Sequence, residues 1–314
     1  MLKPVRLVIS LVFFLFITFI LLDFHELVPP SVSSGVLAFQ FIPSVLKFIA
    51  LTGLAAGGFI IVLVLTALFG RVYCSSLCPL GTFQDIINYL QKKFSRKHRF
   101  RYSKPRNLLR YGLLLITVIS LASGSILLVT LLDPYSNYGR IASDLFRPVY
   151  IGLNNLVAGC LERMNVYFLY PQPLNLASSG LIYIYPLMAL GLITWLTLRN
   201  GRLFCNLICP VGSLLGLLAS LSLFKIKMVE SSCTRCGKCA VSCKSGCISV
   251  KNMAVDFSRC VACYNCIEVC QDDAIRYMIS RPATGRAGRI HAADGGLSRR
   301  VGARLRVGRP RHRP

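Results

Sequence analysis

The most restrictive feature of this sequence is a cysteine pattern that occurs twice near its end. The first copy is Cys233-x2-Cys236-x2-Cys239-x3-Cys243, and the second is Cys260-x2-Cys263-x2-Cys266-x3-Cys270. Each cysteine of the second copy follows its counterpart at one constant interval, which indicates an internal duplication. So short a segment buries little apolar surface by itself, so we expect it to fold around the inorganic centres that its thiols bind.

The spacing is typical of bacterial ferredoxins with two 4Fe-4S clusters, in which the fourth cysteine of each copy binds the other cluster. It predicts Cys233, Cys236, Cys239 and Cys270 as ligands of one cluster, and Cys260, Cys263, Cys266 and Cys243 as ligands of the second. Two zinc sites are the alternative, but zinc ribbons use pairs of C-x2-C and not three cysteines plus one. Cys247 aligns with Ala274 under the same shift and is interpreted as a packing residue.

A second repeated motif lies outside this module. Gly70-Arg71-x2-Cys74-x3-Cys78-Pro79-x-Gly81 recurs later in the chain as Gly201-Arg202-x2-Cys205-x3-Cys209-Pro210-x-Gly212. We hypothesise that Cys74, Cys78, Cys205 and Cys209 jointly hold a further redox centre, of iron–sulfur type. The alternative is that they are small buried residues in turns that end at the prolines. Arg71 and Arg202 either compensate the negative charge of a cluster or extend to the membrane interface.

The rest of the chain is apolar, and 54% of all residues are hydrophobic. Four runs are interpreted as membrane spans: Leu7 to Leu22, Phe48 to Phe69, Leu113 to Leu132 and Gly180 to Leu198. A fifth run, Val211 to Phe224, is too short to cross and is expected to lie at the interface or to re-enter. The basic segment from Lys92 to Arg110 places that loop and both termini in the cytoplasm.

These patterns predict an α-helical polytopic membrane domain over residues 1–228, with four spans in two parallel two-helix repeats. A cytoplasmic α+β ferredoxin domain with two 4Fe-4S clusters is expected over residues 229–280. Residues 281–314 are rich in arginine and lack an apolar pattern, so a disordered tail is expected. The net charge of +24 is concentrated in the tail and beside the spans. It therefore predicts contact with membrane lipid and not with nucleic acid.

Together, the paired Cys-x3-Cys-Pro motifs, the four spans and the trailing ferredoxin module resemble the NapH-type membrane ferredoxins of the quinol dehydrogenase family. They are also similar to the membrane part of the nitrous oxide reductase accessory protein. The resemblance covers Met1 to about Ser280. It implies electron exchange between the quinone pool and iron–sulfur centres in the inner membrane of a bacterium, with further redox proteins as partners.

The expected function is thus a relay of single electrons, as the electron-transfer subunit of a quinol dehydrogenase-type oxidoreductase. The alternative is an iron–sulfur redox sensor, or a metal-reducing assembly factor for a respiratory enzyme. Quinol oxidation needs a proton acceptor, and two groups of polar residues follow predicted spans: Asp23, His25 and Glu26, and then Asp133, Tyr135 and Arg140. An interfacial position explains the first group equally well, and a turn at Asp133-Pro134 explains the second. Cys160 has no assigned role.

Overall fold

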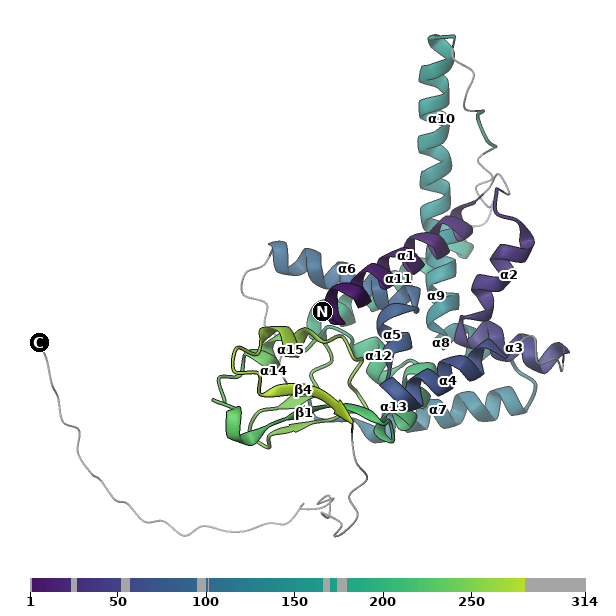
Figure 1. Cartoon of the computed structure of the whole chain (residues 1–314). Coiled ribbons are helices and arrows are strands. Elements are labelled where there is room, and N and C mark those ends of the chain that lie inside the picture. Colours follow the sequence, from purple (N-terminus) through teal and green to yellow (C-terminus); the bar gives the residue numbers. More distant parts are fainter. Residues whose placement is uncertain are drawn as a thin grey trace, which may run out of the picture. The chain divides into compact units, whose positions relative to one another are not determined.

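The computed structural model describes residues 2–23, 27–51, 57–94, 100, 102–165, 170–173 and 180–279. Helices make up the first part of the chain (Figure 1): α1 (Leu2–Leu22), α2 (Pro30–Ala38), α3 (Phe41–Leu51), α4 (Gly58–Phe69), α5 (Val72–Ser76), α6 (Pro79–Phe94), α7 (Asn107–Ala122), α8 (Leu127–Leu132), α9 (Pro134–Arg140), α10 (Arg147–Arg163), α11 (Leu181–Asn200), α12 (Leu203–Leu207) and α13 (Pro210–Ser220). A π-helical segment, Ile141–Phe146, joins α9 to α10.

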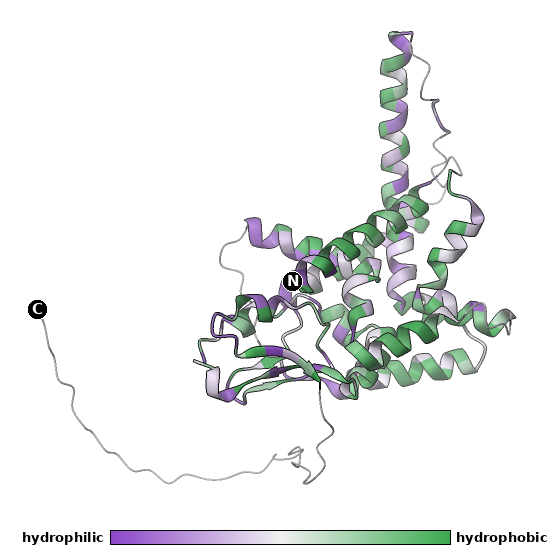
Figure 2. Ribbon diagram, viewed as in Figure 1, coloured by the Kyte–Doolittle hydropathy of each residue, from purple (hydrophilic) through white to green (hydrophobic). Residues whose placement is uncertain are grey.

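Two of the described helices, Leu2–Leu22 and Ile182–Asn200, are long and apolar enough to cross a membrane. They correspond to the first and fourth predicted spans, although α1 begins five residues before the predicted run. Figure 2 shows α1 as a mostly apolar ribbon. Taken together, α2 and α3 are also long and apolar enough to cross a membrane, but the two helices are bent by 104° at the break between them.

The third predicted span is interrupted. Gly124 takes a left-handed φ of 81° two residues after α7 ends, so the 16 residues of α7 are separated from α8. A helix of 16 residues rises only about 24 Å, less than the ~30 Å hydrocarbon core. Gly124 therefore divides a run that hydropathy alone joins. Within the second predicted span, residues 52–56 lie outside the described residues.

Two further helices, α13 and α10, differ in kind from spans. The run from Val211 forms α13, whose buried face, Val211, Leu215 and Ala219, packs against α4 and α7. The helix α10 extends away from the other helices (Figure 1), with Val149, Leu153 and Leu156 exposed. Cys160 lies on α10 and is exposed.

The ferredoxin module closes with a two-stranded antiparallel sheet. Strand β1 (Phe224–Met228) pairs with β4 (Ile275–Ile279), and the short strands β2 (Ile248–Ser249) and β3 (Ala254–Val255) pair with each other. Two five-residue helices, α14 (Lys238–Ser242) and α15 (Asn265–Val269), complete the module. Because β1 is a partner of β4, the sheet of the module includes residues 224–228, which precede the predicted boundary at residue 229.

The module is bonded to the membrane helices at several points. Lys3 in α1 forms an ion pair with Glu268 in α15. The Tyr277 hydroxyl in β4 donates to the carbonyl of Phe69 over 2.9 Å. Arg110 in α7 donates from Nη2 to the carbonyl of Ser258 over 2.8 Å. These bonds hold the cysteine-rich module against one end of the helical part.

Candidate iron–sulfur centres

The two copies of the glycine–arginine–cysteine motif fold alike. In each, a helix ends at a glycine with positive φ, 81° at Gly70 and 68° at Gly201. A five-residue helix then carries the first cysteine, α5 in one copy and α12 in the other. The next helix, α6 or α13, begins at the proline that follows the second cysteine. These helices begin at equivalent positions of the two motifs, so the repeat in the sequence is also a repeat in the backbone.

The four membrane cysteines lie in one buried core. Cys74, Cys78, Cys205 and Cys209 are each between 2% and 4% exposed and belong to one hydrophobic cluster. Polar groups reach into this cluster and contact the sulfur atoms. The Cys205 thiol donates to Gln84 Oε1 over 3.1 Å, and the backbone N–H of Gly212 donates to Cys209 Sγ over 3.2 Å. The buried Gln84 Nε2 has no hydrogen-bond partner among the described residues.

The motif arginines are exchanged between the two repeats. Arg71 donates from Nη2 to the carbonyl of Cys205 and from Nη1 to Asn206 Oδ1, over 3.0 and 2.7 Å. Arg202 donates in turn from Nη1 to the carbonyl of Cys74. Both guanidinium groups are 0% exposed, so neither extends to the membrane interface. That these arginines compensate the negative charge of a cluster stays a prediction.

The last glycine of each motif makes room for the arginine of the other copy. A Cβ atom at Gly212 would stand 2.8 Å from Arg71 Nη2 and would collide with the carbonyl of Cys205. At Gly81 it would stand 3.1 Å from Arg202 Nη1 and would collide with the carbonyl of Cys74. The arginine near the start of each motif and the glycine at its end are therefore both needed for the contact between the two repeats.

One carboxylate balances three cations beside this core. Asp85 in α6 pairs with Arg202 Nη2 at 2.8 Å, Lys244 Nζ at 3.1 Å and Arg6 Nη1 at 3.3 Å. Burial by itself raises the pKa of Asp85, but these cations outweigh it and hold the pKa well below its ordinary value. Because Lys244 follows Cys243 directly, Asp85 connects both membrane repeats to the ferredoxin module.

Left-handed residues shape the ferredoxin module. Positive φ angles occur at Arg235 and Gly237, between the first cysteines, and again at the equivalent positions of the second copy, Ala262 and Tyr264. Three of these residues are not glycine, and such residues rarely adopt this conformation. The two helices α14 and α15 also start at equivalent positions, which agrees with the duplication seen in the sequence.

The cysteines of the module surround two separate cavities. Cys233, Cys236, Cys239 and Cys270 line the first. Cys243, Cys260, Cys263 and Cys266 line the second, together with Cys247. In each cavity the fourth cysteine of one copy joins three from the other, which is the exchange that the spacing predicts. Cys247 is 1% exposed and its sulfur lies 3.5 Å from Cys243 Sγ, so it sits against the second cavity. Its role as a packing residue stays a prediction.

The separation of these thiols bears on the choice between iron–sulfur clusters and zinc. Among the described residues, no three histidine, cysteine or acidic side chains stand close enough to hold a single metal ion. A cluster of several iron and sulfide atoms is wider than one ion, so its thiolates stand farther apart. The preference for iron–sulfur clusters over zinc therefore rests on the cysteine spacing, which is typical of clusters.

The polar residues that follow the predicted spans have local roles where they are described. Asp133 is the N-cap of α9 and accepts from the backbone N–H of Ser136 over 2.8 Å, as the expected turn requires. Asp133 is 1% exposed, and burial raises its pKa to about 6. Arg140 lies over the ring of Tyr185, and Asp23 accepts from the N–H of Val28. His25 and Glu26 lie outside the described residues, as do residues 281–314.

Gln84, Asp85 and Asn206 were not singled out from the sequence. The second repeat has Leu215 where the first has Gln84, so the motif comparison gives no signal there. The only available signal was the polar pair Gln84 and Asn88, four residues apart in a helix and thus on one face of α6. Both residues prove to be buried.

Comparison with known proteins extends these findings. A family described as a 4Fe-4S binding domain matches residues 51–97 and 182–228, which contain the two membrane motifs. A second 4Fe-4S binding domain family matches residues 253–276, in the ferredoxin module. No solved structure matches the chain.

Several curated relatives are ferredoxin-type proteins. The ferredoxin-type protein NapH of Escherichia coli is 28% identical over 76% of this chain and 76% of its own length. The putative electron transport protein YccM of the same organism is 28% identical over 71% of this chain, which spans only 56% of YccM. The methylamine utilization ferredoxin-type protein MauN of Methylobacillus flagellatus is 26% identical over 62% of this chain and 59% of its length. These relatives and the matched 4Fe-4S binding domains support a NapH-type polyferredoxin family for the chain, and the names of the relatives indicate an iron–sulfur electron-transfer protein.

Proposed function

We propose that this protein is a quinol dehydrogenase-like subunit of a bacterial inner membrane, which relays single electrons between the quinone pool and redox proteins. Its cofactors are two 4Fe-4S clusters in the ferredoxin module and a third iron–sulfur centre at Cys74, Cys78, Cys205 and Cys209. Bound clusters would supply reversible one-electron oxidation and reduction. We further propose four spans, the third of which combines α7 and α8 across the break at Gly124. Both termini then lie in the cytoplasm, as the loop charges indicate.

One observation carries this proposal: the three groups of cysteines adjoin one another in order. Cys263 and its neighbour Val261 belong to the same buried core as the four membrane cysteines. The second cavity is therefore the one that adjoins the membrane site. None of the residues that line the first cavity belongs to this buried core, and its Cys236 is exposed. This order leads from the membrane helices to a surface that another redox protein can approach.

Proton acceptance in quinol oxidation is assigned to Asp133. It is buried near the end of an apolar helix, and its pKa of about 6 suits proton exchange near neutral pH. Tyr135 next to it is half-buried, with a pKa raised by burial to about 12, so this phenol stays protonated and able to donate a hydrogen bond.

The test is anaerobic titration of the purified, cluster-loaded protein with menaquinol, followed by absorbance. Wild type should bleach, and the double variant C74S/C205S should not respond to menaquinol while dithionite still reduces its ferredoxin clusters. Iron analysis of the same samples should show a loss of about four iron atoms per chain in the variant. The matched control is C160S, an exposed cysteine outside all three groups.

Two outcomes would overturn the proposal. If C74S/C205S keeps the full iron content, these cysteines do not hold a centre. If wild type is reduced by dithionite but by no quinol, the protein is a redox sensor or an assembly factor instead.

A further inference from the structure

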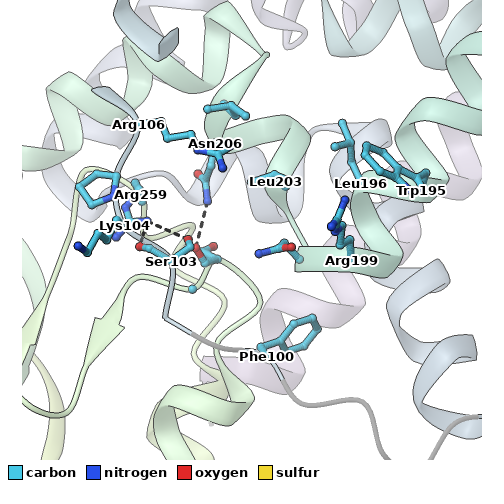
Figure 3. A pocket seen from close by; sticks show the side chains of 15 residues that line it. Phe100, Ser103, Lys104, Arg106, Trp195, Leu196, Arg199, Leu203, Asn206 and Arg259 are labelled. Atoms are coloured by element: carbon cyan, nitrogen blue, oxygen red, sulfur yellow. Dashed lines mark hydrogen bonds between the residues drawn. The ribbon is translucent and has the colours of Figure 1, made fainter. Parts of the chain in front are cut away.

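A large basic cavity lies at the junction between the end of α11 and the ferredoxin module. Its volume is about 610 Å³. Figure 3 shows Trp195 and Arg199 of α11 on one side of it, and Lys104, Arg106 and Arg259 on the other. None of the described lining residues is acidic or a histidine. This cavity adjoins the second cysteine cavity, with which it shares Ser245, but it has no part in the electron relay proposed above.

Two buried polar groups at this cavity lack partners. Arg259 is 5% exposed; its Nε donates to Asp256 over 2.6 Å and its Nη1 to the carbonyl of Ser103 over 2.8 Å. Its Nη2 has no hydrogen-bond partner among the described residues, and the same holds for the hydroxyl of Ser245, which is 7% exposed. Buried donors without partners are costly, so these groups indicate that an acceptor occupies the cavity.

The charge of the cavity indicates an anion. Asp256 offsets Arg259, but Lys104, Arg106 and Arg199 form no ion pair with any described carboxylate. Arg199 instead lies over the ring of Trp195, 5.3 Å from its centre. A quinol is a poor candidate, because its oxidation needs a proton acceptor and the described lining offers neither a carboxylate nor an imidazole.

An apolar track leads along α11 to this cavity. Met188, Leu192 and Trp195 are 69%, 47% and 54% exposed, and with Arg199 they share one face of the helix. Tryptophan followed by arginine at the end of a span is typical of the membrane–water interface. The track suits an acyl chain, and the cations at its end suit a phosphate.

We propose that this cavity binds the phosphate head group of an anionic phospholipid, with an acyl chain lying along Met188 and Leu192. The lipid bridges α11, the segment before α7 and the ferredoxin module. Arg259 and Ser245 lie one and two residues from Cys260 and Cys243, so the lipid also completes the packing beside the second cluster cavity.

Native mass spectrometry of the detergent-solubilised, cluster-loaded protein tests this inference. Wild type that has been stripped of lipid should bind one added phosphatidylglycerol in a saturable manner and should bind phosphatidylcholine far more weakly. The variant K104Q/R199Q removes two exposed cations that hold no other element, and it should weaken phosphatidylglycerol binding roughly tenfold or more. The control K93Q removes an exposed basic residue of α6 outside the cavity and should bind as wild type does.

Trp195 provides a second measurement because it is the single tryptophan of the chain. Phosphatidylglycerol with a brominated acyl chain should quench its fluorescence saturably in wild type, and unlabelled phosphatidylglycerol should reverse the quenching. Equal retention of the two lipids, or equal loss in K93Q and K104Q/R199Q, would overturn the proposal. Full competition by inorganic phosphate at similar concentration would overturn the lipid assignment and identify a site for free anions.

Discussion

Arg71, in the first membrane repeat, donates a hydrogen bond from Nη2 to the carbonyl oxygen of Cys205 in the second repeat, 3.0 Å away. The same Nη2 stands 3.8 Å from Cys74 Sγ. One buried cation therefore contacts a cysteine of each repeat, and it lies where an iron–sulfur centre held by these cysteines would place negative charge.

The charge of Arg71 should raise the reduction potential of that centre. In R71Q we expect the potential to fall by on the order of 60 mV, a tenfold change in the one-electron equilibrium. A redox titration followed by electron paramagnetic resonance measures it. R71K keeps the charge and should restore most of the potential, while R163Q, on the exposed end of α10, should leave it unchanged. A normal potential in R71Q would show that Arg71 has only a structural role.

Removal of the Asp85 carboxylate should loosen the ferredoxin module. In D85N the cations of Arg202 and Lys244 lose their common partner, and breaking such a buried pair costs about 3–5 kcal/mol. Thermal unfolding in detergent should show the loss, and limited proteolysis should cut the segment before α7 sooner. Because the folded pKa of Asp85 is depressed, its contribution is present above the unfolded pKa and is lost as the pH falls through the lower folded value. Wild type should therefore approach D85N only in strong acid.

The exchange of the fourth cysteines has a spectroscopic consequence. C270S should perturb the same cluster as C233S, and C243S the same cluster as C260S, as judged by the two electron paramagnetic resonance signals and by iron content. C247A is the control: its thiol lines the second cavity but is surplus to the predicted ligands, so about eight iron atoms should remain in the module. If C270S instead matches C260S, each copy of the motif binds its own cluster.

Asp133 should destabilise the folded protein above about pH 6. Its pKa is raised by burial from its ordinary value to about 6, so the folded state binds the extra proton between these values and stability falls as the pH rises through them. The penalty is about 3 kcal/mol once both states are ionised. D133N keeps an acceptor at the N-cap of α9 but cannot ionise. It should therefore be more stable than wild type at about pH 7.5 and similar at about pH 4, as measured by thermal unfolding.

The variant D133N also distinguishes the two roles considered for Asp133, the N-cap of α9 and a proton acceptor in quinol oxidation. If Asp133 serves in quinol oxidation, D133N should lower the rate of reduction by menaquinol at least tenfold while reduction by dithionite stays normal. A more stable protein with an unchanged quinol rate would leave Asp133 as a cap alone.

The parts of the site that depend on short, fixed spacings could be predicted from the sequence. The intervals between cysteines are set by the size of the centre that they surround. The structure accordingly has one cavity lined by Cys233, Cys236, Cys239 and Cys270, and a second lined by Cys243, Cys260, Cys263 and Cys266. The left-handed residues obey the same constant interval: Ala262 and Tyr264 of the second copy correspond to Arg235 and Gly237 of the first, because equivalent thiols need equivalent turns.

Other features depend on partners that are distant in the sequence. Asp85 is required by Arg202, which is 117 residues away, and no local pattern connects them. The exposure of Arg71 and Arg202 was also open, since an arginine at the end of a span can extend to water or turn inward. The break in the third predicted span could not be foreseen from hydropathy, which is insensitive to the backbone freedom of Gly124.

The reciprocal arginine contacts impose an order on biogenesis. Asn206 and Cys205, the partners of Arg71, are made about 135 residues after it, which at ribosomal speed takes roughly ten seconds. Until then the guanidinium of Arg71 lacks these two acceptors, and burying it without acceptors would be costly. The enclosure of Arg71, Cys74 and Cys78 against the second repeat therefore follows the synthesis of that repeat.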